Sequence, residues 1–186
     1  MEKAIKPRLM LHCCCAPCLI TAIERLINYE PVVFFFNPNI HPYEEYKKRL
    51  ESVLKYCNIK KLKLVEGDYD VDSWFRKIRK INNYEKEPEG GKRCSACFEL
   101  RLEKTADLAL SEGIKFFSTT LTLGENKNSQ LINSIGKRLG DERGLYFVEL
   151  NLKKKKGKIL SLKESREHSI YRQNYCGCIY SMKNKI

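Results

Sequence analysis

The chain has 186 residues, of which 42% are hydrophobic and 31% charged, and its formal net charge is +12. This length suits one domain with a full hydrophobic core, and the apolar content excludes wholesale disorder. The longest apolar runs are far too short to cross a bilayer and no secretory signal is visible, so we expect a cytoplasmic protein without a membrane partner.

Short apolar runs alternate with helical patterns along the chain. The predicted strands are residues 8–13, 32–36, 61–65, 115–118 and 145–150. The predicted helices are residues 17–27, 42–57, 71–81, 95–112 and 128–139, of which the last two end at Gly113 and Gly140. Repeated strand–helix units predict an α/β fold: a Rossmann-like parallel sheet with helices on both faces, formed by residues 1–186 as one domain.

The cysteines indicate a metal site rather than a disulfide scaffold. There are nine, an odd number that cannot pair completely, and eight of them fall into three tight groups. The groups are Cys13, Cys14, Cys15 and Cys18; Cys94 and Cys97; and Cys176 and Cys178. Grouped thiolates of this kind select zinc, copper or an iron–sulfur cluster. Because the first group follows a predicted strand, we expect it at the carboxyl edge of the sheet, where parallel sheets form their sites.

The candidate ligands outnumber those of a single centre. A tetrahedral site or a cluster needs four ligands, and seven cysteines are well placed. The seven are Cys14, Cys15, Cys18, Cys94, Cys97, Cys176 and Cys178. Adjacent residues of a strand point in opposite directions, so Cys14 and Cys15 indicate two centres, or one centre and a free thiolate. Asp70 could complete a second, mixed site, whereas Cys57 continues a helical apolar stripe and is predicted to be core.

Neither the histidines nor any nucleotide motif indicates a different chemistry. We expect His12 to pack or hydrogen-bond beside the cysteines, His41 to be a loop or helix-cap residue, and His168 to lie on the surface. The chain contains no GxGxxG after its first strand and no GxxxxGK[ST] loop, which are the usual signatures of a phosphate-cradling turn.

The positive charge is concentrated in residues 151–186, here called the basic segment. It holds ten Lys/Arg and two Glu, against 25 Lys/Arg and 21 Asp/Glu in the first 150 residues. Such a run is either a solvated tail or a phosphate-binding surface. The segment carries its own cysteine pair, and metal ligation would anchor it, so we expect it to be ordered and to close over the metal site.

Several motifs together resemble one family. Residues 11–18, LHCCCAPC, are similar to its opening HxCCAPC motif, and residues 37–42, NPNIHP, to its second block. Residues 68–70, DYD, and 87–98, EPEGGKRCSACF, with Arg101 and Leu102, match the third and fourth. Residues 118–122, STTLT, and 171–178, YRQNYCGC, complete the set. The chain therefore resembles QueH, the cobalamin-independent epoxyqueuosine reductases, although residues 124–127 depart from the Ser-Pro-containing loop of many members.

This resemblance implies a chemistry and a set of roles. It implies a 4Fe–4S cluster beside a second metal ion, expected to be iron, and reduction of the epoxide of epoxyqueuosine in tRNA, the last step of queuosine biosynthesis. We assign Cys15, Cys94, Cys97 and one further thiolate, Cys18, to the cluster. Cys14, Cys176, Cys178 and Asp70 are assigned to the second metal, with Cys14 and Asp70 as catalytic residues. The set of ligand residues is indicated more strongly than their assignment to the cluster or to the second metal.

The same resemblance implies partners. The electrons are expected from an external donor such as ferredoxin or flavodoxin, since no flavin or nicotinamide site is visible. The anticodon arm of the tRNA is expected to meet a set of basic side chains, and its modified base to stack on Tyr171 or Tyr175. The basic side chains are Lys153, Lys154, Lys155, Lys156, Lys158 and Arg172.

Two other interpretations remain open. A zinc-stabilised RNA-binding module without catalysis explains the charge and one cysteine group, but not the adjacent Cys14 and Cys15. A tRNA sulfur-transfer enzyme would use a catalytic cysteine pair, but such enzymes usually carry an SGGxDS nucleotide loop, which is missing from this sequence.

Overall fold

A five-stranded parallel sheet forms the centre of the described chain. The computed structural model describes residues 5–123, 127–150 and 155–183, with the backbone alone for residues 123, 155–158 and 183. Within these ranges the strands are β1 (Arg8–His12), β2 (Glu30–Phe35), β3 (Lys63–Glu66), β4 (Phe116–Thr119) and β5 (Tyr146–Phe147). Their order is β3-β2-β1-β4-β5 and every neighbouring pair is parallel. The predicted α/β fold is confirmed.

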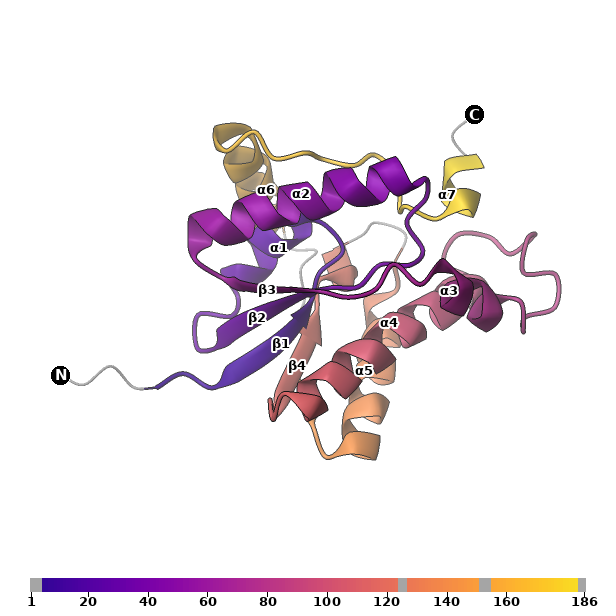
Figure 1. The fold of residues 1–186 in the computed structure, drawn as a ribbon, viewed down its shortest axis with the longest axis horizontal. Helices are drawn as coiled ribbons and strands as arrows, with labels where there is room; N and C mark the ends of the chain where they lie inside the picture. The colour runs from indigo at the N-terminus through magenta and orange to yellow at the C-terminus, as the bar shows by residue number, and fades with distance from the viewer. Residues whose placement is uncertain (1–4, 124–126, 151–154, 184–186) are drawn as a thin grey trace.

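Helices cover both faces of this sheet (Figure 1). One face carries α1 (Ala16–Ile23), α2 (Tyr43–Lys60) and α6 (Lys155–Glu167), and α1 contacts both of the others. The other face carries α4 (Lys92–Ser111) and α5 (Ser129–Arg143), with α3 (Val71–Ile78) packed on α4. The short helices η1 (Leu121–Leu123) and α7 (Ile179–Lys183) complete the described elements. Among the described residues, no helix is both long and apolar enough to cross a membrane.

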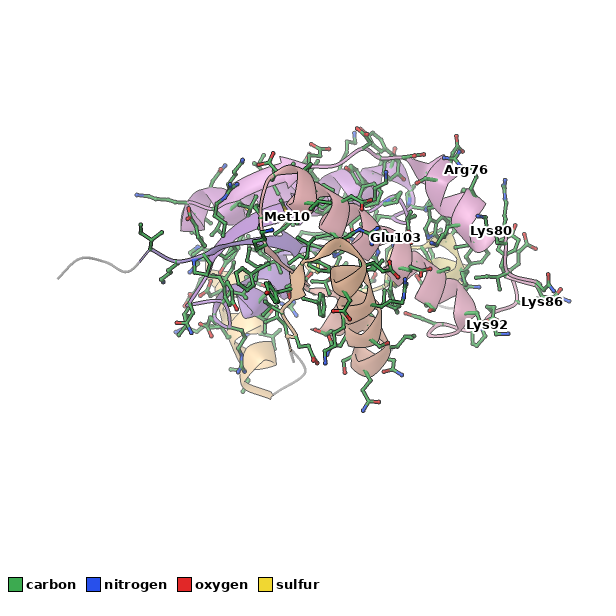
Figure 2. The ribbon with its side chains drawn as sticks, turned by 90° about the horizontal axis from the view of Figure 1, so that it is seen from below. Met10, Arg76, Lys80, Lys86, Lys92 and Glu103 are labelled. Carbon is green, nitrogen blue, oxygen red and sulfur yellow. The ribbon has the colours of Figure 1, made fainter. Side chains whose placement is uncertain are left out.

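The strands supply both cores because their side chains alternate between the faces. Leu9 and Leu11 of β1 lie in the core under α1 and α2. Met10, between them, lies in the core under α4 and α5, and Figure 2 shows it within the body of the molecule. A sheet buried on both faces explains why the strands appear as continuous apolar runs in the sequence.

The register of the strands brings three loops to one edge. His12 at the end of β1 is paired with Phe34 of β2 and with Thr119 of β4, so these strands end side by side. The loops that follow β1, β2 and β4 therefore meet at the carboxyl edge of the sheet. This is where parallel sheets place their sites, and it is where the first cysteine group lies.

The predicted end of the fifth helix is wrong. The helix α5 continues through Gly140 to Arg143 and ends at Gly144, whose φ of 64° is the left-handed conformation that favours glycine. Gly140 has a different reason to be glycine: a Cβ there would lie 2.7 Å from the carbonyl oxygen of Leu145. It permits close packing of α5 and does not stop the helix.

The helix α6 was not predicted, and the strand β5 is shorter than the predicted residues 145–150. α6 lies against α1, where the Ser161 hydroxyl donates to the carbonyl of Pro17 at 2.8 Å. Of the lysine run, Lys153 and Lys154 lie outside the described residues, and Lys155, Lys156 and Lys158 belong to the first turn of α6.

Candidate metal centre

Three buried thiols meet directly after β1. The Sγ atoms of Cys14, Cys15 and Cys18, here called the cysteine trio, all lie within 4.8 Å of one another. The separation is 3.8 Å between Cys14 and Cys15 and 3.0 Å between Cys15 and Cys18. Cys15 is the N-cap of α1 and has extended backbone, so the adjacent thiols converge although the chain is turning from strand to helix. Buried soft ligands in this arrangement indicate metal or cluster binding.

The backbone of the trio is fixed from the neighbouring strands. Thr120, which follows β4, accepts a hydrogen bond from the Cys14 amide through its Oγ1 at 3.3 Å. Asn37, which follows β2, donates from Nδ2 to the carbonyl of Cys13 at 2.9 Å. Both residues lie in motifs that resemble the family, and these contacts give them a physical role.

The other two cysteine pairs approach each other. Cys94 lies in the first turn of α4 and Cys97 in the second, and Cys176 and Cys178 precede α7. Burial raises the pKa of the Cys94 thiol to about 11, and charges on Cys97, Cys176 and Cys178 act in the same direction. These four, here called the cysteine quartet, are therefore close enough to influence one another electrostatically.

Arg49 of α2 holds the loop that carries Cys176 and Cys178. Its guanidinium donates from Nη1 to the Cys176 carbonyl at 3.0 Å and from Nη2 to the Tyr175 carbonyl at 3.1 Å. Its Nε donates to Glu45 at 2.7 Å, which supplies a counterion. Gly177 must be glycine here, because its φ is 115° and a Cβ would lie 3.1 Å from Nη1 of Arg49.

Residues before the CxC pair connect α6 to the trio. Gln173 donates from Nε2 to the Sγ of Cys15 at 2.8 Å. Arg172 donates from Nη1 to the hydroxyls of Ser161 and Ser165 on α6, each at 3.0 Å. The last part of the basic segment therefore lies directly on the trio.

Asp70 has other partners in this structure. It is the N-cap of α3, and its Oδ1 accepts from the amide of Ser73 at 2.9 Å. Its Oδ2 lies 3.8 Å from Arg76, and the residue lines a groove of about 380 Å³ beside β3 with Lys104. None of the contacts described for Asp70 reaches a cysteine.

The trio shares its protons unequally. Hydrogen bonds from the Cys15 and Cys18 thiols lower the pKa of Cys14 well below its ordinary value, and the charges of Lys127 and Arg101 act in the same direction. Burial raises the pKa of Cys15 to about 12. Since a thiolate is the form that binds metal, loading the trio with metal releases its thiol protons.

Two cysteines stand apart. Burial raises the pKa of Cys57 to about 12, and its side chain lies in the core under α1 and α2, so the prediction for Cys57 is confirmed. Cys13 lies in the same core, and burial raises the pKa of its thiol well above the ordinary value.

The prediction for His12 is also confirmed. Its Nε2 lies 3.2 Å from the Phe36 carbonyl and its Nδ1 lies 2.9 Å from the Thr119 hydroxyl. The carbonyl can only accept, so the proton belongs on Nε2. Burial and the charge of Arg101 lower the pKa of His12 to about 3, which keeps the ring neutral.

The sequence did not reveal the polar side chains that surround the thiols. Arg49, Arg101 and Gln173 were not singled out for this role, because arginine and glutamine on helices and loops are most often exposed. One signal was available for Arg101: it follows Cys97 by four residues and Cys94 by seven, which places all three on one face of α4.

A parallel α/β sheet with buried cysteines at its carboxyl edge defines a thiol-rich metal-binding protein. Residues 9–184 match the family model described as "Epoxyqueuosine reductase QueH". The chain belongs to this family.

Relatives in several bacteria carry the name Epoxyqueuosine reductase QueH. The protein of Thermotoga maritima is 39% identical over 173 residues, which cover 93% of this chain and 89% of the relative. That of Staphylococcus epidermidis is 38% identical over 189 residues, covering 97% and 79%. That of Acinetobacter baylyi is 36% identical over 180 residues, covering 95% and 81%.

The residues around the thiols fit a buried metal cluster. Two residues that contact the cysteines carry buried polar atoms with no hydrogen-bond partner in the described chain: Oε1 of Gln173 and Nη2 of Arg101. Buried polar groups are nearly always paired, so these atoms indicate a missing group or substrate. The soft thiol set, with Nη2 of Arg101 as a donor, is suited to a metal ion or a metal cluster.

Proposed function

We propose that this chain reduces the epoxide of epoxyqueuosine in tRNA and so produces queuosine. Membership of the family supports the reaction, and the observation that carries the chemistry is the convergence of Cys14, Cys15 and Cys18 within 4.8 Å at the carboxyl edge of the sheet. The alternative of a tRNA sulfur-transfer enzyme is not supported, because the sequence lacks the nucleotide loop that such enzymes usually carry.

The reaction removes one oxygen atom. Both epoxide C–O bonds break, a C=C bond forms, and the oxygen leaves as water after uptake of two electrons and two protons. The electrons come from an external one-electron donor of the ferredoxin or flavodoxin class.

The seven cysteines of the trio and the quartet are the proposed ligands of a 4Fe–4S cluster and a second metal ion. When bound, the cluster relays single electrons, and a second metal with an open position polarises the C–O bond. We retain Cys15, Cys18, Cys94 and Cys97 for the cluster and Cys14, Cys176 and Cys178 for the second metal. We retain Asp70 as a ligand of the second metal through Oδ2, since its cap on α3 uses only Oδ1.

The chain's own residues prepare this centre. Arg49 positions the CxC loop, and Thr120 and Asn37 fix the backbone before the trio. Six of the seven thiols are buried, all except that of Cys176, and this burial excludes water from them. His12 keeps its proton on Nε2, directed at the Phe36 carbonyl, so it orients the loop and does not exchange protons with substrate near neutral pH.

Two sets of basic side chains support a tRNA partner. One is the lysine run that leads into α6. The other lies on α3 and the connection to α4, where Arg76, Lys80, Lys86 and Lys92 are exposed and project outward in Figure 2. Lys92 begins the helix whose first turn holds Cys94. Phosphate contacts from such side chains position RNA without reading its sequence.

Tyr171 is the better candidate for stacking on the modified base. It is 37% exposed, whereas the ring of Tyr175 already has the guanidinium of Arg49 over it at 5.2 Å.

The test combines metal analysis with an activity assay. Anaerobically purified protein should be brown, contain about four or more irons per chain by cluster stoichiometry, and convert epoxyqueuosine to queuosine in tRNA when supplied with a low-potential reductant. Cys94→Ala should abolish the conversion and reduce the iron content. Colourless protein containing one zinc and no activity would instead establish the RNA-binding module.

A further inference from the structure

Arg101 is a buried cation beside the thiols. It lies on α4 one turn after Cys97 and is 1% exposed. Its Nε donates to the Cys97 carbonyl at 3.3 Å and its Nη1 donates to Oδ1 of Asn37 at 3.3 Å. Its Nη2 has no partner in the described chain. Both acceptors are neutral, so these contacts do not balance the charge.

Arg49 is a buried arginine of the same site whose charge is neutralised by a carboxylate. It is 2% exposed and forms an ion pair with Glu45 at 2.7 Å. Across residues 5–123, 127–150 and 155–183, Arg101 forms no ion pair with a carboxylate. An uncompensated charge in the interior is strongly unfavourable, so a counterion for Arg101 is expected.

The groups that face Arg101 are cysteines. It interacts electrostatically with Cys97, Cys176, Cys14 and Cys94, which belong to both the trio and the quartet. A second cation, Lys127, faces Cys14 and Cys176 and also repels Arg101. Two positive charges therefore face the same cysteines. Protonated thiols are neutral, whereas cysteines that hold metal are thiolates. Loading therefore turns every cysteine around Arg101 into an anion, which supplies the counter-charge in full.

We propose that Arg101 is the fixed counter-cation of the cluster and raises its reduction potential. This inference rests on the proposed function, because it requires an iron–sulfur cluster on these cysteines. Reduction adds one electron from the external donor to an already anionic cluster, and a buried positive charge stabilises the reduced form more than the oxidised form. The potential of such clusters follows net charge, hydrogen bonding and burial. Arg101 thus makes the cluster easier to reduce.

Three variants separate charge from structure. Arg101→Met removes the charge and approximates the volume. Arg101→Lys keeps the charge but loses the planar fork. Arg101→Gln also removes the charge but keeps a side-chain amide that can donate to Oδ1 of Asn37. Arg138→Met, on the exposed face of α5, is the matched control for loss of one arginine charge.

The measurements are the midpoint potential of the iron-loaded protein, from a redox titration followed by electron paramagnetic resonance, and the unfolding temperature with and without iron. We expect a shift to lower potential in Arg101→Met and Arg101→Gln, and a potential close to that of the wild type in Arg101→Lys and Arg138→Met. Loading with iron should raise the unfolding temperature of Arg101→Met and Arg101→Gln by less than it raises that of the wild type.

The outcomes distinguish this inference from the proposed function. Wild-type protein without iron would overturn both. Iron-loaded variants with unchanged potentials, or equal losses of unfolding temperature in the empty and loaded forms, would show that Arg101 is only structural. If Arg101→Met fails to fold, the potential of Arg101→Gln decides: a lower value supports the inference and an unchanged value overturns it.

Discussion

At the scale of single residues, the surroundings of a thiol decide what it can do. The thiol of Cys57 faces apolar side chains under α1 and α2, and burial raises its pKa to about 12. The thiol of Cys14 faces other thiols and two cations, and its pKa is lowered. Both side chains are buried, but their surroundings shift the pKa of the thiol in opposite directions.

This contrast predicts the behaviour of Cys57→Ala. The variant should keep the full iron content, because the thiol has no contact with the trio or the quartet. It should lose about 1–2 kcal/mol of unfolding free energy, since a small buried group is removed from a packed core. Chemical denaturation and iron analysis measure both. A loss of iron equal to that of Cys94→Ala would show that Cys57 is a ligand.

Sequence reasoning found the thiols but not what lies between them. Cysteines are recognisable by type and spacing, so all three groups could be predicted. Whether two groups face each other depends on tertiary contacts such as those of Arg49 with the Tyr175 and Cys176 carbonyls, which no local pattern encodes. Arg101 was missed for a related reason: a charged residue on an amphipathic helix is read as exposed unless its counterion is known.

At the scale of elements, the hydrophobic pattern predicts only the elements that bury apolar side chains. The strands and the long helices were found in this way. The helix α6 was missed because its most deeply buried side chains are polar: Ser161 is 2% exposed, whereas Ile159 is 67% exposed and Leu160 is only partly buried. Ser161 and Ser165 bond to Pro17 and Arg172 there, so hydrogen bonds replace the apolar stripe.

Gly140 allows a direct test of the corrected α5. Alanine favours a helix over glycine by about 1 kcal/mol. Here its Cβ would lie 2.7 Å from the Leu145 carbonyl oxygen, which is backbone and cannot rotate away. Gly140→Ala should therefore lower the unfolding free energy by roughly 1–3 kcal/mol despite the gain in helix propensity. Asp141→Ala, at an exposed position of the same helix, should change it by less than about 0.5 kcal/mol. Stabilisation by Gly140→Ala would contradict the packing described here.

The contact between α2 and the CxC loop gives a second prediction for an element. Arg49→Lys keeps the charge beside Glu45, but one ammonium cannot reach both carbonyls in the fork geometry of the guanidinium. Loss of one or two such bonds should weaken docking of residues 171–178 by about 1–3 kcal/mol. Hydrogen exchange of peptides covering these residues should become faster.

The control for this variant is Arg143→Lys. Arg143 pairs with Asp107 at 2.8 Å on the far face of the sheet, so its replacement should leave exchange in residues 171–178 unchanged. Equal protection in the wild type and in Arg49→Lys would mean that the loop is held by other contacts.

At the scale of the whole molecule, charge and chemistry meet at the same edge of the sheet. The carboxyl edge holds the cysteines, and the basic segment contacts the trio through Gln173. The opposite edge also carries cations, because Arg8 begins β1 and Lys63 begins β3. Both of these side chains form ion pairs with Glu112. A polyanion is therefore expected to bind at the carboxyl edge.

The salt dependence of tRNA binding tests this expectation. Replacing Lys153, Lys154, Lys155 and Lys156 by alanine removes four charges, and alanine keeps the helical propensity needed where α6 begins. If each lysine meets a phosphate, the slope of log K against log salt should become shallower by roughly 3, from about 0.7–0.9 per contact. The loss of affinity should be the same for tRNA with and without the epoxide, and the absorption spectrum of the centre should not change.

The matched control removes the same net charge from the opposite edge. Lys6, Arg8, Lys63 and Lys115 are all exposed at or just before the amino ends of strands, and their replacement by alanine should leave the slope as it is in the wild type. Equal losses in both variants would mean that tRNA responds to overall charge and not to an oriented surface. A change in the spectrum only in the lysine-run variant would mean that this run supports the metal centre itself, since Gln173 and Arg172 link the end of α6 to Cys15.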